Sequence, residues 1–265
     1  MLIRVPFFLV LIVTGFHSIV FSQVATETRQ YKVTRVKQAV AVDKEHFYVI
    51  NNSTISRHNK KDESIDLQWD GTKDDIKHLN SGIVIKGKLY CANSNYPAVP
   101  MASSIEIFDT KTLQHVGTHS FGIAVYGSLT WIDYKDGKWW AGFAQYKGKG
   151  SNVGKDPGWT TVVKFNKNWQ QEGAWIFPEN IVKAFGTMSN SGGAWGKDGF
   201  LYCTGHDAAE FYVMKIPETG YTLRHIKTIA APVHGQGIAI DHSVKDKLVI
   251  YGLKSSEIIS VMEIK

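Results

Sequence analysis

The chain has 265 residues, of which 43% are hydrophobic and 20% are charged, and Lys and Arg outnumber Asp and Glu by 30 to 24. The basic residues are scattered and never form a dense run. This pattern disfavours nucleic-acid binding, and we expect no nucleic-acid partner. Residues 23–265 are enough for one domain core and too few for two ordinary domains.

The first 22 residues have the layout of a secretory signal peptide. A short basic region that ends at Arg4 precedes an apolar run over residues 5–13. Gly15 interrupts the continuation of this run, which disfavours a spanning helix. We therefore expect residues 1–22 to be cleaved and residues 23–265 to form a single domain. The mature protein is expected to be secreted or periplasmic, without stable membrane insertion.

A repeated pattern runs through the rest of the chain. Each copy has a polar residue, a short apolar strand, a charged or glycine-containing turn and a second apolar strand, most clearly over residues 190–207. Most copies lie roughly 45 residues apart, and a period of about 20 to 50 residues built from short strands is typical of propellers and solenoids. The five copies begin at Gln38, Ser81, Ser128, Ser191 and Gln236.

The expected strands fall into five groups. Four groups contain four strands each, over residues 38–69, 81–120, 128–177 and 191–229. The last group, over residues 236–264, contains only three, and the alternating segment 31–36 can supply the fourth. Closing the ring in this way removes unpaired sheet edges. The sequence thus predicts an all-β, five-bladed β-propeller in which an N-terminal strand closes the last blade, with residues 23–30 forming a loose segment before that strand.

The two cysteines occupy the same position of the repeat. Cys91 and Cys203 both end a Leu-Tyr-Cys sequence, in the second and fourth copies. Those blades are not neighbours in a ring of five, so the two Cα atoms should lie beyond the limit of about 7 Å for a disulfide. We expect two free, buried thiols.

Polar residues recur where the first strand of each copy begins and where the second ends. In a propeller these points open on one face, at the mouth of the central channel. Turn chemistry explains Asn, Ser, Asp and Gly there, but Gln and His are not special turn formers. Convergent polar groups in a pocket are the default ligand site. The substrate-binding candidates are Gln38, His78, Asn80, Gln145, Tyr146, Asn190 and Gln236, with Trp131 at the rim and Trp159 placed to stack on a sugar ring.

The pair His206-Asp207 ends the clearest copy and has no counterpart in the other four. An imidazole beside a carboxylate can act as a general base with its orienting group, or the two can ligate a divalent metal together with His234 or His78. The structural alternative is an exposed histidine beside an aspartate that caps its own turn. We take His206, Asp207 and His234 as the catalytic candidates.

Two resemblances extend this hypothesis. Residues 193–207 and 237–241 resemble the blades of gluconolactonase-like and cycloisomerase-like propellers. The resemblance implies a sugar acid, lactone or oligosaccharide ligand, and a divalent metal such as calcium held by Asn93, Asn190 and Asp207. The segment His234-Gly-Gln-Gly-Ile238 is similar to a Gln-Gly-containing segment of the exported, propeller-type glutaminyl cyclases, which gives a third interpretation.

The sequence leaves open whether the protein is an enzyme. As a lactone hydrolase or cycloisomerase, it would use His206 as the acid–base group, with Asp207 orienting it or binding the metal. The alternative is a non-catalytic propeller that binds a glycan or a protein. For the leading hypothesis the expected partner is a small molecule or carbohydrate, and we expect a monomer.

Overall fold

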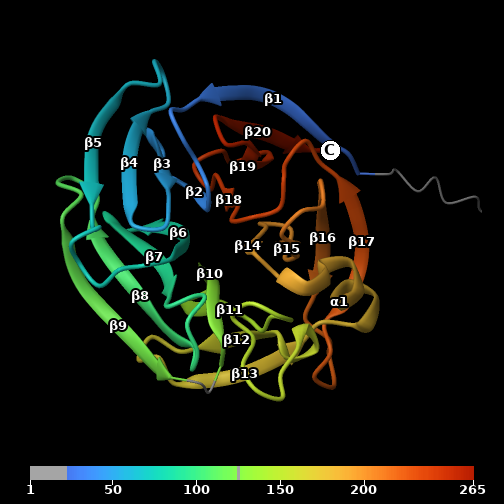
Figure 1. Ribbon diagram of the computed structural model, residues 1–265. Helices are drawn as coiled ribbons and strands as arrows, with labels where there is room; N and C mark the ends of the chain where they lie inside the picture. Colours follow the sequence, from blue (N-terminus) through green and yellow to red (C-terminus); the bar gives the residue numbers. More distant parts are fainter. Residues whose placement is uncertain (1–22, 124–125) are drawn as a thin grey trace, which may run out of the picture.

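The computed structural model describes residues 23–123 and 126–265 as five four-stranded antiparallel sheets around a central channel (Figure 1). This arrangement confirms the predicted five-bladed β-propeller. The predicted signal peptide, residues 1–22, lies outside the described residues. Within the described part of the chain, no helix is long and apolar enough to cross a membrane.

Four blades are made of consecutive strands that run from the channel outward. Blade 1 consists of β2 (Ala39–Val42), β3 (His46–Ile50), β4 (Thr54–Asn59) and β5 (Ile65–Asp70). Blade 2 consists of β6 (Leu79–Ile85), β7 (Lys88–Ser94), β8 (Ala102–Asp109) and β9 (His115–Ile123). Blade 3 consists of β10 (Ser128–Lys135), β11 (Lys138–Ala144), β12 (Thr161–Phe165) and β13 (Gln171–Ile176). Blade 4 consists of β14 (Gly192–Trp195), β15 (Leu201–Thr204), β16 (Glu210–Lys215) and β17 (Arg224–Ala230).

Blade 5 joins the two ends of the described chain. Its strand order is β1 (Ala25–Lys32), β20 (Ile258–Ile264), β19 (Leu248–Ser255) and β18 (Ala239–Ile240). The N-terminal strand is therefore the outermost strand of the last blade, as predicted (Figure 1).

The position of the closing strand differs from the prediction. Residues 25–30 are part of β1, although this segment was expected to be loose, and the strand ends at Lys32 rather than at residue 36. The outer face of β1 is exposed, so its polar side chains cost little, and its backbone pairs with β20 from Ala25 opposite Ile264 to Lys32 opposite Ile258. The prediction missed this part of the edge strand because its side chains are polar, whereas the strand is held in the sheet by backbone hydrogen bonds.

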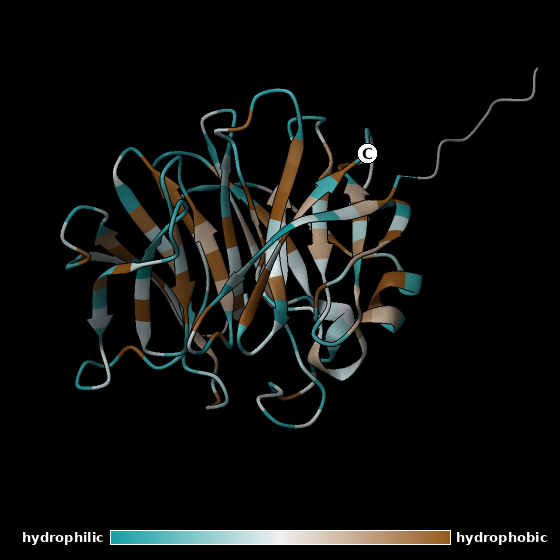
Figure 2. Cartoon of the chain, turned by 90° about the horizontal axis from the view of Figure 1, so that it is seen from above, coloured by the Kyte–Doolittle hydropathy of each residue, from teal (hydrophilic) through white to brown (hydrophobic). Residues whose placement is uncertain are grey.

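Hydrophobic side chains fill the interfaces between neighbouring blades. Each of the five interfaces holds one cluster of buried residues. Seen from the side, apolar residues lie mainly on the strands and polar residues mainly on the connecting loops (Figure 2). At the interface that closes the ring, the Tyr31 ring lies 4.4 Å from that of Phe47 in blade 1 and 6.1 Å from that of Tyr251 in blade 5. Tyr31 thus joins β1 to both blades.

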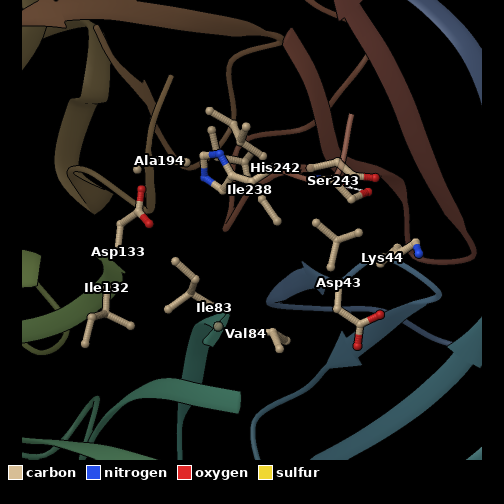
Figure 3. Close-up of a pocket in the computed structure, with 16 residues that line it drawn as sticks. Asp43, Lys44, Ile83, Val84, Ile132, Asp133, Ala194, Ile238, His242 and Ser243 are labelled. Carbon is tan, nitrogen blue, oxygen red and sulfur yellow. Dashed lines mark hydrogen bonds between the residues drawn. The ribbon is translucent and has the colours of Figure 1, made fainter. Parts of the chain in front are cut away.

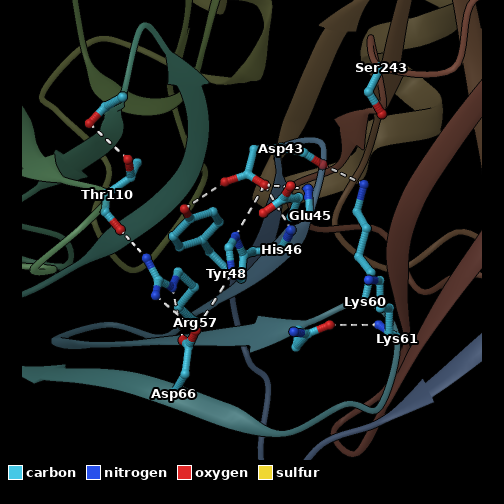
Figure 4. A network of polar contacts seen from close by, with 12 residues as sticks. Asp43, Glu45, His46, Tyr48, Arg57, Lys60, Lys61, Asp66, Thr110 and Ser243 are labelled. Carbon is cyan, nitrogen blue, oxygen red and sulfur yellow. Dashed lines mark hydrogen bonds and ion pairs between the residues drawn. The ribbon is translucent and has the colours of Figure 1, made fainter.

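Polar contacts reinforce the ring where blade 1 meets its neighbours (Figure 4). The Lys60 ammonium of blade 1 lies 2.7 Å from the carboxylate of Asp241 in blade 5, which is only 4% exposed. On the other side of the blade, Arg57 pairs with Asp66 at 2.8 Å and also donates to the backbone carbonyl of Thr110 in blade 2. Lys60, Asp241, Arg57 and Asp66 are therefore all paired where blade 1 meets its neighbours.

The expectation for the two cysteines is confirmed. Cys91 and Cys203 are both free and buried, one in blade 2 and the other in blade 4. A helical segment precedes blade 4, as α1 (Glu179–Phe185) followed by the short η2 (Gly186–Met188). The long connection between β11 and β12 contains η1 (Pro157–Trp159).

Truncation of Tyr31 tests how much ring closure depends on β1. Tyr31 is 2% exposed, so Tyr31→Ala should lower the free energy of unfolding by about 3 to 5 kcal/mol, the usual cost of removing a buried aromatic ring. The measurement is denaturant unfolding followed by tryptophan fluorescence.

The matched control is Tyr221→Ala, because Tyr221 is 71% exposed and its loss should change stability by no more than about 0.5 kcal/mol. Equal effects of the two substitutions would contradict the role given to Tyr31.

Candidate functional site

Two β-bulges place polar side chains at the start of the inner strands. The pairing of β6 with β7 shifts register between Leu79 and Ser81, and that of β10 with β11 shifts between Leu129 and Trp131. The extra residues are Asn80 and Thr130, and both line a cavity at one mouth of the channel. A bulge re-aims one side chain without disturbing the rest of the strand.

Gln236 reaches the same cavity from blade 5 through an unusual backbone conformation rather than a β-bulge. Its φ is 75°, in the left-handed region that non-glycine residues rarely adopt. Its N–H donates to the Gly205 carbonyl at 3.0 Å and its carbonyl accepts from the Thr204 hydroxyl at 2.6 Å. A Cβ at the next residue, Gly237, would lie 2.5 Å from the Cβ of Ala39, so only glycine permits this approach to blade 1.

The resulting cavity, here called the polar cavity, has a volume of about 200 Å³. Every blade, with its adjoining loops, contributes to it, and none of the described residues that line it is Asp or Glu. The lining residues are Gln38, His78, Asn80, Tyr96, Thr130, Tyr146, Met188, Ser191, His206 and Gln236. The mouth therefore offers amides, hydroxyls and imidazoles rather than fixed negative charge.

One wall of the polar cavity is aromatic. The His78 ring lies 5.1 Å from that of Tyr96, which in turn meets Tyr146 edge-on at 5.0 Å. Burial lowers the pKa of His78 to about 4, so its imidazole is neutral at neutral pH. Burial also raises the pKa of Tyr146 well above its usual value, so the phenol keeps its proton. These groups can donate or accept hydrogen bonds without carrying charge.

His206 brings acid–base chemistry to the opposite side, from the loop that follows β15. Its Nδ1 lies 2.6 Å from a carboxylate oxygen of Asp207, and its side chain is 35% exposed. Since a carboxylate can only accept, Nδ1 carries the proton of the neutral ring and Nε2 keeps a lone pair. The arrangement can take a proton from a bound molecule or from water at Nε2.

Five of the seven residues predicted to bind substrate at the channel mouth meet in this cavity: Gln38, His78, Asn80, Tyr146 and Gln236. The other two are buried beside it and bond internally. Gln145 is 1% exposed and its amide bonds to the Tyr126 carbonyl at 2.6 Å and to the Asn152 amide at 2.9 Å. Asn190 is fully buried, and its amide donates to the carbonyls of Gly192 and Thr204.

The two tryptophans predicted to contact ligand also lie outside the cavity lining. Trp131 is fully buried between blades 3 and 4, where its indole N–H donates to the Asn190 side-chain oxygen at 2.5 Å. Gly142 and Gly193 leave the space that the indole occupies, since a Cβ at either position would lie within 2.4 Å of the indole. Trp159 is 56% exposed, with the Lys155 ammonium 5.5 Å above its ring.

The side chain of His234 lines a different cavity from that of His206, although the next residue, Gly235, packs against the His206 backbone. His234 is exposed and lines a separate shallow cavity with Val36 and Leu253, although Gln236 borders both cavities. The backbone N–H of His234 bonds to the Leu253 carbonyl at 2.7 Å. The three catalytic candidates thus separate into a contiguous pair, His206 and Asp207, and His234, whose side chain lines the other cavity.

The predicted metal ligands do not form a metal site. Asn93 bonds to the His78 backbone N–H and to the Ser104 hydroxyl, while Asn190 is buried and bonded elsewhere. The side chain of Asp207 is 84% exposed. In addition, no three His, Cys, Asp or Glu residues of the described chain gather as a metal would require. The donor set does not fit calcium, which takes six to eight oxygen ligands.

Thr130 and Met188 line the polar cavity but were not identified from the sequence. Blade 3 begins at Ser128, as predicted, but the bulge that turns its third residue, Thr130, toward the cavity leaves no local signature in the sequence. Met188 belongs to η2, the short helical turn before blade 4. An apolar residue in such a turn gives no sign of facing a polar mouth.

The fold and the cavity define a five-bladed β-propeller with a polar pocket at one mouth of its channel. No protein-family model and no curated protein matches the chain, so the resemblance to gluconolactonase-like and cycloisomerase-like proteins is confirmed only at the level of the propeller fold.

Among solved structures, the chain is similar to the WD40 repeats of RRP9, with 10% identity and a TM-score of 0.46 over 86% of this chain and 67% of that one. It is also similar to a protein of unknown function from Bacteroides caccae, with 11% identity and a TM-score of 0.46 over 78% of this chain and 65% of that one. The chain spans about two thirds of the length of each. Both are distant likenesses and identify no family.

The depressed pKa of His78 predicts a loss of stability in acid. An unfolded histidine takes up its proton near pH 6.5, whereas folded His78 does so near pH 4. As pH falls from about 6.5 to 4, protonation of this histidine in the unfolded chain therefore lowers the free energy of unfolding by up to about 3 kcal/mol. His78→Gln should weaken this pH dependence, measured as urea unfolding at pH 7 and pH 4.5.

The control is His234→Gln, because His234 is exposed and lacks that burial. An NMR titration in which the His78 ring protonates near pH 6.5 would refute the prediction.

Proposed function

We propose that this protein is an exported propeller that binds a small, hydroxyl-rich organic molecule, such as a sugar acid, lactone or oligosaccharide end, in the polar cavity. The observation that carries the proposal is the convergence of neutral polar side chains from all five blades on one space of about 200 Å³. Export rests on the composition of residues 1–22.

The chemistry of the lining suits such a ligand. Hydroxyl groups both donate and accept, and they are met here by the amide of Gln236, the hydroxyl of Thr130 and the side-chain oxygens of Gln38 and Asn80, whose amide nitrogens bond within the protein. Neutral His78 adds a donor or acceptor without charge. The absence of Asp and Glu from the described lining removes repulsion against the carboxylate of a sugar acid.

As an enzyme, the protein would hydrolyse or rearrange a lactone with His206 as the acid–base group. In hydrolysis, Nε2 takes a proton from water as the water oxygen attacks the lactone carbonyl carbon. Collapse of the tetrahedral intermediate then breaks the ring C–O bond, and the imidazolium returns the proton to the leaving alkoxide. Asp207 holds Nδ1–H and stabilises the imidazolium between these steps. The product is the open hydroxy acid.

A non-catalytic propeller that binds the end of a glycan is the second candidate. It is favoured by the 84% exposure of the Asp207 side chain, since a carboxylate in water orients and stabilises an imidazolium less than a buried one. Exposed Trp159 would then offer a sugar-stacking surface outside the cavity. No observation favours the glutaminyl-cyclase-like interpretation over these two.

Turnover of aldonolactones separates the two candidates. We expect the wild type to hydrolyse glucono-δ-lactone or a related lactone, followed by proton release in weak buffer, and His206→Ala to reduce kcat by about 10² or more. Asp207→Asn should reduce kcat by about tenfold, because the ring loses its orienting charge.

The matched control is His225→Ala, which removes a histidine on β17 outside the polar cavity and should leave kcat unchanged. Binding of a sugar acid without turnover, unaffected by His206→Ala, would support the glycan binder instead. Failure of the wild type to bind any sugar acid, lactone or oligosaccharide would overturn the proposal.

A further inference from the structure

A second cavity opens at the other end of the channel, where the inner strands finish (Figure 3). It has a volume of about 210 Å³. We call it the Asp133 cavity, because Asp133 and Asp241 are both buried in its wall but only Asp241 has an ion-pair partner among the described residues. Its walls are mostly apolar, and the hydrophobic side chains that line it are Val42, Ile83, Val84, Ile132, Ala194, Ile238, Ala239 and Ile240.

The two cavities follow from the period of two along the inner strands. In blade 5, Gln236 faces the polar cavity, while Ile238 and Ile240 face the Asp133 cavity. In blade 3, Thr130 faces the first and Ile132 the second. The same rows of alternate residues are therefore polar at one end of the channel and apolar at the other.

Asp133 places a carboxylate in this apolar wall. The residue is 3% exposed, and its two oxygens accept from the backbone N–H groups of Tyr134 at 2.7 Å and Trp195 at 2.6 Å. Among the described residues it has no ion-pair partner within 4.0 Å. Loss of water on burial raises the pKa of this carboxyl above its usual value despite both hydrogen bonds. The charge is thus incompletely compensated.

The other two carboxylates at this mouth are already matched. Asp43 accepts from the Tyr48 hydroxyl at 2.8 Å and from two backbone N–H groups. Asp241 pairs with Lys60 at 2.7 Å and accepts from the Ser243 hydroxyl at 2.5 Å. Asp133 differs from both because its hydrogen-bond partners among the described residues are two backbone N–H groups, those of Tyr134 and Trp195.

The nearby basic side chains of the described residues leave the carboxylate of Asp133 open to a ligand. Lys44 lines the cavity from blade 1, across the space from Asp133 (Figure 3). His242 and Lys135 act on Asp133 only through longer-range attraction, and His242 is exposed. A buried acid that faces a cavity and has no adjacent counter-charge is stabilised by a cation that enters the cavity.

We propose that the Asp133 cavity binds a small organic monocation with an apolar body, such as a primary alkyl- or arylalkylamine. The ammonium group lies against the Asp133 carboxylate, and the apolar body lies among Ile83, Ile132 and Ile238. A bare divalent metal is a poorer fit, because such ions need several oxygen or nitrogen ligands and no cluster of three His, Cys, Asp or Glu exists among the described residues.

Three probes of similar shape test charge recognition on the wild-type protein. We expect benzylammonium to bind with one-to-one stoichiometry, benzyl alcohol to bind at least about tenfold more weakly and benzoate more weakly still. Calorimetry gives the affinities, and NMR should show shifts in the methyl groups of Ile83, Ile132 and Ile238.

Variants then locate the site. Asp133→Asn keeps the side-chain shape and should weaken benzylammonium binding by about tenfold or more. Asp241→Asn is the matched control, since it removes a carboxylate from the same mouth that Lys60 already neutralises, and should change the affinity by less than about threefold. His206→Ala alters only the polar cavity and should have no effect, so failure of this proposal is distinguishable from failure of the proposed function.

Equal affinity for the amine and the alcohol would overturn the proposal, because the cavity would then recognise only apolar shape. Absence of benzylammonium binding to the folded wild type would also overturn it. If Asp133→Asn does not fold, the comparison of the three probes on the wild type still decides, and unperturbed isoleucine methyl groups at saturation would place the amine elsewhere.

Discussion

The whole structure depends on the pairing of β1 with β20. A propeller blade buries its two faces only against neighbouring blades, so an open ring would expose two complete faces and an unpaired edge. Backbone hydrogen bonds from residue 25 to residue 32 close the last sheet, and Tyr31 and the Lys60–Asp241 ion pair join that sheet to blade 1. Both cavities are lined by residues from all five blades, so neither exists until this pairing has formed.

Closure also explains why glycine clusters where the inner strands begin. The strands converge on the channel, and there the blades approach one another more closely than side chains allow. Gly193 leaves room for the Trp131 indole, and Gly237 lets blade 5 reach blade 1. The glycine-containing body of the repeat over residues 190–207 is therefore scaffold, whereas Ser191 and His206 line the polar cavity and Asp207 lies beside His206.

The sequence was sufficient to predict the features that recur in every blade, but not the features that occur in a single blade. Blade number, ring closure and the separation of Cys91 from Cys203 follow from the period of the repeat, and each is confirmed. The β-bulges at Asn80 and Thr130 could not be predicted. A bulge changes the face of the sheet on which a side chain lies, but it leaves no mark in the amino-acid composition. Trp131 and Asn190 were expected at the mouth, but they satisfy each other in the core, and only the tertiary contact decides between these two placements.

Strand β10 connects the two ends of the channel. It contributes Thr130 to the polar cavity, Ile132 and Asp133 to the other, and Trp131 to the interface between blades 3 and 4. Because the indole is enclosed by Gly142 and Gly193 and is bonded to Asn190, the strand cannot slide along the channel without losing that fit. The Asp133 carboxylate adds a second bond to blade 4, through the Trp195 N–H. Ligands at either end would therefore meet walls that are already in place, and their binding would cost little ordering of the protein.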